Sequence, residues 1–267
     1  MSRKIRIGAL ISGGGTNLQA IMDNCESGKI DGQMVFVGSD NPDAGGLERA
    51  QKHGLPTFVV DYASIIRKYR EASPALSPPH DFKLEETMAK QAFFHADAVS
   101  EKVKTFFVTR AIAEAKLLSE MKAYEIDLLV LAGFMRNLTP YFIDRVNTDR
   151  SQPRIMNIHP SLLPAFAGTD GYGDTWRYGC KVGGCTVHFV DYGEDTGPII
   201  GQAAFQFSED DTLETIKERG LEVEWQLYSE CIQLYAQGRL QTEKMTRTLG
   251  NGQKIERTIV KILPSNS

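Results

Sequence analysis

The stretch Asn157-Ile158-His159-Pro160-Ser161-Leu162-Leu163-Pro164 constrains this chain more than any other. It follows a short run, 154–156, that is typical of one buried strand, and its two prolines prevent that strand from continuing. Asn157 and His159 are two positions apart, so their side chains point the same way at the end of the strand. In an open α/β sheet, ligands bind at this end of the strands.

An amide and an imidazole side by side are suited to acyl transfer. The imidazole, which titrates at about pH 6.5, can move a proton, and the amide can stabilise negative charge that develops on a carbonyl oxygen. Asn157 and His159 are therefore candidate catalytic residues. An isolated Asn-x-His pair is more often a buried histidine beside a turn, so the rest of the chain has to decide between the two interpretations.

Composition excludes several classes of protein. The chain has 267 residues, of which 42% are hydrophobic and 24% charged, as expected for a soluble globular protein. The net charge of −4 provides no basic field for nucleic acid. Apolar runs such as 128–134 are too short to span a bilayer, and the N-terminus leads directly into a strand. We expect a cytoplasmic protein without nucleic-acid or membrane partners.

The cysteines and histidines do not indicate a metal site. Four cysteines are too few and too scattered for a disulfide framework, and none of the five histidines forms a His-x-His or His-x₃-His pair. No metal is expected. A redox pairing of Cys180 with Cys185 stays open, although reduced structural thiols are favoured.

The N-terminal segment has the pattern of a strand, a glycine loop and a helix. Residues 5–11 are typical of a strand, and Ser12-Gly13-Gly14-Gly15-Thr16-Asn17 precedes a helical pattern. Such a loop at a helix N-terminus suits one phosphate group. The spacing matches neither a dinucleotide fingerprint nor a Walker loop. A merely tight turn between strand and helix explains the glycines equally well.

Strands and helices alternate along the rest of the chain. Strands are expected at 34–39, 57–60, 127–133 and 184–190, and helices at 47–53, 111–124 and 211–238. This alternation predicts an α/β fold, with a Rossmann-like, mostly parallel sheet and helices on both faces. Residues 134–138, after the most apolar strand, would form a pocket wall or simply an apolar loop that closes the core.

Three segments remain outside this pattern of alternating strands and helices. Residues 64–109 contain a loop rich in proline and then apolar positions at helical spacing from Leu84 to Phe106, so a helical insertion is expected there. Its apolar face must be buried against the body of the protein or against a second subunit, which makes a homodimer one expectation. Residues 167–174 are expected to form a flexible loop. Residues 241–267 are expected to be a strand-bearing extension of a 1–240 catalytic domain.

An acidic loop precedes Gly197-Pro198. Residues 191–195 would by themselves be an ordinary solvated turn. Beside a catalytic histidine, however, a carboxylate from this loop would favour the imidazolium form.

Four motifs together resemble the folate-dependent formyltransferases. They are the glycine loop with its flanks at 11–19, Leu131-Ala132-Gly133-Phe134-Met135-Arg136, the octapeptide 157–164, and Thr186–Phe189 with 195–200. The octapeptide and the acidic loop are shared across these enzymes. The glycine loop is similar to that of the phosphoribosylglycinamide formyltransferases of purine biosynthesis, and the resemblance extends to about Leu240.

The resemblance implies a transfer of the formyl group from 10-formyltetrahydrofolate to the amine of glycinamide ribonucleotide. It implies that the catalytic residues are Asn157, His159 and Asp195. The residues that it implies for the ribonucleotide are Gly15, Thr16, Asn17 and Glu224. Those that it implies for the folate are Arg110, Met135, Arg136, Asn137, Leu138, Asn157, Asp191 and Asp195.

Other functions remain open at this point. A formyl hydrolase and a sugar-nucleotide formyltransferase use the same co-substrate, and a non-catalytic binding protein could keep the same fold. The glycine loop argues against the first two, and the three expected catalytic residues argue against the third. The chain departs from the family in its long 64–109 segment, in the absence of His-x-His at 169–179, and at Thr196, where glycine is common.

Overall fold

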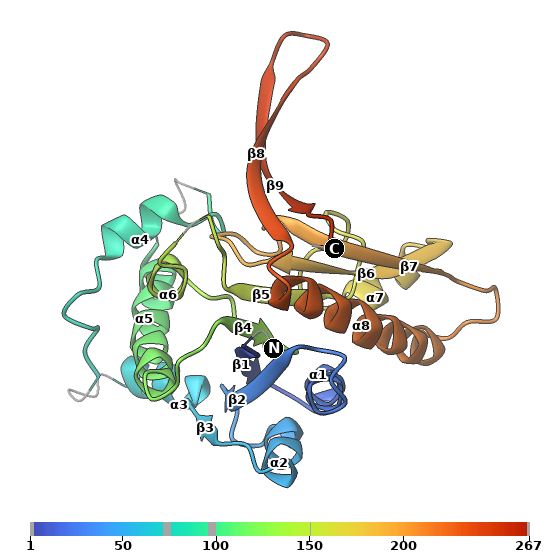
Figure 1. The fold of residues 1–267 in the computed structure, drawn as a ribbon. Coiled ribbons are helices and arrows are strands. Elements are labelled where there is room, and N and C mark those ends of the chain that lie inside the picture. Colours follow the sequence, from blue (N-terminus) through green and yellow to red (C-terminus); the bar gives the residue numbers. More distant parts are fainter. Residues whose placement is uncertain (1–2, 72–75, 96–99, 150, 266–267) are drawn as a thin grey trace.

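A seven-stranded sheet forms the centre of the computed structural model, which describes residues 3–71, 76–95, 100–149 and 151–265. The strand order is β3-β2-β1-β4-β5-β6-β7 (Figure 1). The strands are β1 Ile5–Ile11, β2 Gly32–Ser39, β3 Thr57–Val59, β4 Leu128–Leu131, β5 Ile155–His159, β6 Val182–Phe189 and β7 Ile199–Gln206. Strands β1 to β5 are parallel, whereas β6 and β7 are antiparallel to their neighbours. The expected mostly parallel α/β sheet is confirmed.

Helices cover both faces of this sheet. On one face lie α1 Thr16–Glu26, α2 Gly45–Lys52 and α8 Leu213–Ala236, and on the other α3 Tyr62–Arg70, α5 Glu101–Met121 and α6 Pro140–Val146 (Figure 1). The position of β4 in the sheet explains why its sequence is apolar without interruption. The sheet has one hydrophobic core on each face: the first lies under α1, α2 and α8, and the second under α3, α5 and α6. Leu128 and Val130 belong to the first core, and Leu129 and Leu131 belong to the second. A strand that is covered on both faces needs apolar residues at every position.

The strand order changes direction beside β1, which pairs with β2 on one side and with β4 on the other. Loops that leave the carboxyl ends of such strands diverge and open a crevice. Two hydrogen bonds join the loops across it. The Ser12 backbone N–H donates to the Gly133 carbonyl at 3.0 Å, and the Met135 backbone N–H donates to the Ser12 hydroxyl at 2.8 Å. The predicted phosphate loop and the predicted pocket wall therefore share one crevice.

The 64–109 segment is less regular than its spacing predicts. The expected helix from Leu84 to Phe106 is wrong as a continuous element, because α4 Leu84–Lys90 ends before α5 begins. The Gln91 side chain accepts hydrogen bonds from the backbone of Phe93 and Phe94, which turns the chain away from a helical path. Phe94 then packs edge-on against Phe106 of α5. Of the residues in the predicted segment, 72–75 and 96–99 lie outside the described residues.

Helix α5 also replaces the separate helix expected at 111–124, and this places Arg110 in the middle of a helix. The flexible loop expected at 167–174 is partly ordered, since α7 Gly171–Arg177 begins inside it. Gly171 makes this possible. A Cβ atom there would lie 2.5 Å from the Pro160 carbonyl oxygen and 3.2 Å from the His159 ring, so a side chain does not fit.

The C-terminal residues form a long hairpin that leaves the body of the protein (Figure 1). It consists of β8 Leu240–Thr248 and β9 Lys254–Ile262, which pair antiparallel as a separate two-stranded sheet. Its base is attached to the body, because Leu240 and Val260 pack against the first core. Within the described residues, no helix combines the length and the apolar composition needed to cross a membrane.

Candidate active site

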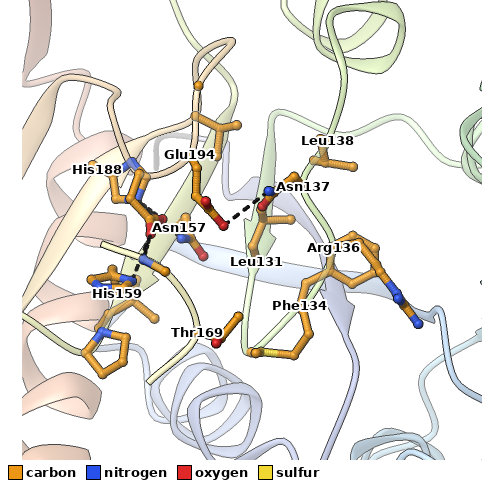
Figure 2. Close-up of a pocket in the computed structure, with 18 of the residues that line it drawn as sticks. Leu131, Phe134, Arg136, Asn137, Leu138, Asn157, His159, Thr169, His188 and Glu194 are labelled. Atoms are coloured by element: carbon orange, nitrogen blue, oxygen red, sulfur yellow. Dashed lines mark hydrogen bonds and ion pairs between the residues drawn. The ribbon is translucent and has the colours of Figure 1, made fainter. Parts of the chain in front are cut away.

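Strand β5 places the two central side chains of the site. Its antiparallel partner β6 pairs Asn157 with His188 and His159 with Thr186. Residues that pair directly across two strands have neighbouring side chains on the same face. Asn157 and His188 therefore lie together, next to His159 (Figure 2).

His159 is buried, with 3% of its surface exposed, and both ring nitrogens face oxygen atoms. Its Nδ1 lies 3.2 Å from Asp195 Oδ2, and its Nε2 lies 2.8 Å from the Phe166 carbonyl oxygen. A carbonyl oxygen only accepts hydrogen bonds, so Nε2 carries a proton. An imidazolium would donate from both nitrogens, to the carbonyl and to the carboxylate. Both ring nitrogens of His159 thus face oxygen atoms that can accept a hydrogen bond.

Asp195 lies close to both histidines. Burial, the largest influence, acts to raise the pKa of its carboxyl group. The nearby His188 ring, the charge of His159 and the Gly168 backbone N–H, which donates to Oδ2 at 3.0 Å, together outweigh it. The pKa of Asp195 therefore lies below its ordinary value, and the group is a carboxylate at neutral pH. The backbone φ of Asp195 is 54°, in the left-handed region, which aspartate adopts more readily than most other non-glycine residues.

Asn157 and His188 form a second pair. Asn157 Nδ2 lies 3.2 Å from His188 Nε2, and His188 Nδ1 lies 2.9 Å from the Phe189 carbonyl oxygen. His188 Nε2 is also 3.6 Å from Asp195 Oδ1. One ring therefore lies against both the predicted catalytic amide, Asn157, and the predicted catalytic carboxylate, Asp195. The resemblance included the motif that contains His188, but we assigned no role to this residue. His188 lies opposite Asn157 on the neighbouring strand, and this position could have identified it. The sequence alone, however, does not show that β5 pairs with β6.

The glycine loop ends in a left-handed residue, Gly15, with φ 72° and ψ 37°, immediately before α1. A Cβ atom on Gly15 would lie 2.8 Å from the Cα of Gly46, so the loop packs directly on the start of α2. No side chain of the described residues caps the first turn of α1. Its backbone N–H groups thus remain available to an anion.

Arg49 of α2 holds this loop from the other side, and sequence reasoning missed it. Its Nε donates to the Gly14 carbonyl oxygen at 2.8 Å. The bond orients the Gly14–Gly15 peptide and adds positive charge near the loop.

Asn17 and Glu224 meet between α1 and α8. Asn17 Nδ2 donates to Glu224 Oε2 at 2.6 Å, and both residues are buried. Burial raises the pKa of Glu224, and the hydrogen bond from Asn17 offsets this only in part. The Asn17 Oδ1 atom is buried without a hydrogen-bond partner in the described part of the chain. An unpartnered buried acceptor at a cavity indicates a ligand donor such as a hydroxyl or an amine.

The loop after β4, residues 133–138, forms another wall of the site. Leu138 is buried, whereas Met135 has 57% of its surface exposed at the mouth of the site. Arg136 Nε pairs at 2.5 Å with Oδ2 of Asp40, a residue buried at the end of β2. Asn137 Nδ2 donates to Glu194 Oε1 at 3.2 Å, which connects this wall to the acidic loop.

Arg110 is buried, with 8% of its surface exposed. Its guanidinium lies over the rings of Tyr62 and Phe106, at 5.1 and 4.9 Å from their centroids. Its Nε and Nη1 find no hydrogen-bond partner among the described residues, and burial lowers its pKa. A buried cation with free donors indicates an anionic ligand group.

The Asp191 carboxylate, unlike most of the other predicted site residues, forms its hydrogen bonds within its own loop. Its Oδ1 accepts hydrogen bonds from the Gly193 backbone N–H at 3.1 Å and from the Thr196 hydroxyl at 2.6 Å. The carboxylate thus shapes the acidic loop from within. Thr196, the departure from the family glycine, takes part in the same arrangement.

These parts enclose a cavity of 340 Å³ (Figure 2). The predicted residues in its lining are Asn17, Arg110, Met135, Arg136, Asn137, Leu138, Asn157, His159, Asp195 and Glu224. Gly15, Thr16 and Asp191 lie outside its described lining. Gly168, Thr169 and His188 line it without having been predicted. Among the described residues, no group of three or more His, Cys, Asp or Glu side chains is arranged to hold a metal ion.

Comparison with known proteins agrees with this geometry. The model of the formyl transferase family matches residues 5–232. This chain belongs to the formyl transferase family. It is 34% identical to the phosphoribosylglycinamide formyltransferase of Haemophilus influenzae, over 88% of this chain and 89% of that protein. It is 31% identical to the enzyme of the same name from Bacillus subtilis, over 83% and 89%.

Solved structures give the same family. Glycinamide ribonucleotide transformylase 1 from Symbiobacterium toebii superposes with a TM-score of 0.70 at 37% identity, and covers 99% of this chain and 96% of its own. Each of these relatives is named a phosphoribosylglycinamide formyltransferase or a glycinamide ribonucleotide transformylase, the group of formyl transferases to which the glycine loop pointed. The crevice of this family member contains the predicted catalytic residues.

Proposed function

We propose that this formyl transferase moves the formyl group of 10-formyltetrahydrofolate to the amine of glycinamide ribonucleotide, as a step of purine biosynthesis. The observation that carries this proposal is the meeting of Asn157, His159 and Asp195 in one cavity that also contains Asn17 and Glu224. The names of the relatives above support the substrate.

The reaction begins when the amine nitrogen attacks the formyl carbon. A carbon–nitrogen bond forms, and the carbonyl oxygen becomes an oxyanion. The amine then loses a proton, the bond from the carbon to folate N10 breaks, and N10 receives a proton. The products are the formylated ribonucleotide and tetrahydrofolate. The protein has to stabilise the oxyanion and to move the proton.

Asn157 and His159 supply the donors for the oxyanion. The Asn157 amide has two hydrogens, and the one that faces His188 Nε2 leaves the other for the substrate. His159 would donate as an imidazolium and then pass a proton towards N10. In the structure its Nε2–H is bound to the Phe166 carbonyl, so the substrate oxygen must compete with that carbonyl. The ionised Asp195, 3.2 Å from Nδ1, stabilises the charged ring.

The two substrates enter from opposite sides. Gly15, Thr16 and the first turn of α1 would hold the phosphate, and Asn17 and Glu224 would hold the ribose side of the ribonucleotide. Residues Met135–Leu138, Arg110 and the acidic loop around Asp191 would hold the folate. Asn17 and Glu224 from the first group and Arg110 and Met135–Leu138 from the second line the same cavity as Asn157.

A transfer assay with both substrates tests the proposal. Purified protein should release tetrahydrofolate only when glycinamide ribonucleotide is present, with one formylated product for each folate consumed. Release of formate at the same rate without the ribonucleotide would identify a hydrolase. Tight binding of both ligands without turnover would identify a binding protein.

We further propose that the enzyme is cytoplasmic, that residues 1–240 form the catalytic domain, and that 64–109 and 241–267 are additions to it. A homodimer is the assembly that we propose. An isolated two-stranded hairpin is marginal in water, and β9 exposes Ile255 and Ile262 while the turn between β8 and β9 exposes Leu249. Sedimentation velocity distinguishes a dimer from a monomer.

A further inference from the structure

Helix α7 brings a buried tyrosine against α8 (Figure 1). Tyr172 has only 5% of its surface exposed. Its ring lies edge-on to the ring of Phe205 in β7, with 6.0 Å between the two centroids. A Cβ atom on Gly220 of α8 would lie 2.3 Å from the Cζ atom of Tyr172, so a side chain at that position does not fit. The tyrosine ring is therefore fixed between β7 and α8.

The Tyr172 hydroxyl lies beside the carboxyl group of Glu224. Glu224 follows Gly220 by four positions, so both residues lie on one side of α8. The hydroxyl is buried and has no hydrogen-bond partner of ordinary geometry among the described residues. It nevertheless lies close enough to act on Glu224. Burial raises the pKa of Glu224, and the Asn17 amide and the Tyr172 hydroxyl lower it without cancelling the effect of burial.

Tyr172 reaches Glu224 from behind the active site. Asn17 and Glu224 line the cavity, whereas Tyr172 lies outside its described lining. The tyrosine therefore acts on a ligand in this cavity only through Glu224. It belongs to the segment 169–179, in which the chain departs from its family by lacking His-x-His.

The cations on the turns of α8 before Glu224 are paired with other groups. Lys217 Nζ lies 3.7 Å from Asp170 Oδ1. Arg219 Nη2 lies 2.5 Å from Asp211 Oδ1. Neither cation takes the place of a hydrogen-bond donor to the Glu224 carboxyl group.

Two titratable groups face Glu224 from other elements, the Tyr172 hydroxyl from α7 and the Cys185 thiol from β6. Burial raises the pKa of both groups, that of Cys185 to about 12. Both are therefore neutral when Glu224 titrates. Of the two, the hydroxyl is the stronger hydrogen-bond donor.

We propose that Tyr172 is a positioning residue for the ribonucleotide, and that its hydroxyl fixes the Glu224 carboxylate in the orientation that receives the ribose side of this substrate. This inference rests on the proposed function, because Glu224 is assigned to the ribonucleotide there. An ionised carboxyl group offers both of its oxygens as acceptors to ligand hydroxyls. Loss of the Tyr172 donor should therefore weaken binding most at the pH values where Glu224 takes up a proton.

The experiment measures KM for glycinamide ribonucleotide between about pH 5.5 and about pH 9 in the unaltered protein and in Tyr172→Phe. Without the hydroxyl, the pKa of Glu224 rises. KM of the variant should thus exceed that of the unaltered protein by about tenfold at the acid end and by at most about twofold at the alkaline end. The kcat value should stay within about twofold. Titration of His159 and of the substrate amine is common to both proteins and cancels in this ratio.

Two further variants serve as controls. Tyr178→Phe removes a hydroxyl from a tyrosine at the end of the same helix that has 80% of its surface exposed, and its KM ratio should stay near one at every pH. Glu224→Gln does not titrate. Adding Tyr172→Phe to Glu224→Gln should change KM by less than about twofold, because the group through which the hydroxyl acts is gone.

Each other outcome overturns a defined statement. A KM ratio that is the same at every pH, or an equal rise in Tyr178→Phe, overturns the positioning role. A tenfold rise on the Glu224→Gln background overturns it as well, since the hydroxyl would then not act through Glu224.

Calorimetric binding of the ribonucleotide without folate gives the same ratios as Kd values and does not depend on turnover. Absence of transfer by the unaltered protein, with the expected Kd ratios, overturns the proposed function and leaves the positioning role intact. Absence of both transfer and binding overturns both.

Discussion

The Nδ1 atom of His159 lies 3.2 Å from Oδ2 of Asp195, although His159 ends β5 and Asp195 comes from the loop before β7. The pairing of β5 with β6 and of β6 with β7 brings the two residues together. A buried ring between a carboxylate and a carbonyl is held in one orientation.

His188 should act by positioning Asn157 and Asp195. Replacing it with alanine removes the partner 3.2 Å from the Asn157 amide, and kcat should fall about tenfold with little change in either KM. His188→Gln, which can place a polar group near the lost Nε2, should recover part of the rate. Steady-state kinetics checks this. A loss as large as that of His159→Ala would mean that His188 itself acts on the formyl group.

Glu224 should affect only the ribonucleotide. Its carboxyl group is buried against Asn17, so Glu224→Ala should raise the KM for glycinamide ribonucleotide by about tenfold or more. The KM for formyl folate should stay within about twofold. Glu222→Ala, an exposed acid of the same helix, is the control. Equal effects on both KM values would contradict the division of the site into two sides.

Glu114 should make stability depend on pH. It is fully buried under Thr139, which donates to its two oxygens from the backbone and the hydroxyl at 2.7 and 2.5 Å. Burial raises the pKa of Glu114 from 4.5 to about 7 despite these bonds. The folded protein thus binds a proton that the unfolded chain has lost. Its free energy of unfolding should fall between pH 4.5 and about 7 by at most about 3 kcal/mol through this group.

Denaturant unfolding of Glu114→Gln measures this contribution. The amide keeps both contacts with Thr139 but does not titrate. The free energy of unfolding of the variant should therefore lack the decrease that Glu114 causes between pH 4.5 and about 7. It should equal or exceed the unaltered protein in stability above pH 7. The exposed Glu120→Gln of the same helix should leave the pH dependence as it is. Parallel stability curves for Glu114→Gln and the unaltered protein would refute the assignment.

The distal half of the β8–β9 hairpin should be dispensable for transfer. Lys244 and Thr258 are paired in register, so a two-residue Asn-Gly turn can replace 245–257. The anchoring residues Leu240 and Val260 remain. The transfer rate should stay within about twofold, because none of the removed residues lines the active-site cavity. A lost transfer rate with an unchanged Tm would give the hairpin a role in catalysis.

Much of the fold could be predicted from apolar runs, because a strand that is covered on both faces, such as β4, is apolar at every position. The site was predictable where one motif carries neighbouring groups, as with Asn157 and His159. His188 was missed because its role depends on strand pairing, which no local pattern contains. The break after Lys90 was missed because the Gln91 side chain, and not a proline or glycine, turns the chain. The burial of Glu114 was not predicted, because the helical pattern of α5 does not show which of its charged residues lies in the core.

The central claim is that Asn157, His159 and Asp195 act together on the formyl group. Single-turnover formation of formylated ribonucleotide at saturating substrates tests it most directly, in the unaltered protein, His159→Ala and Asp195→Ala. Both variants should bind the substrates and keep their fold by circular dichroism, yet form product slower by on the order of a hundredfold or more. Near-normal rates in both variants would contradict the claim.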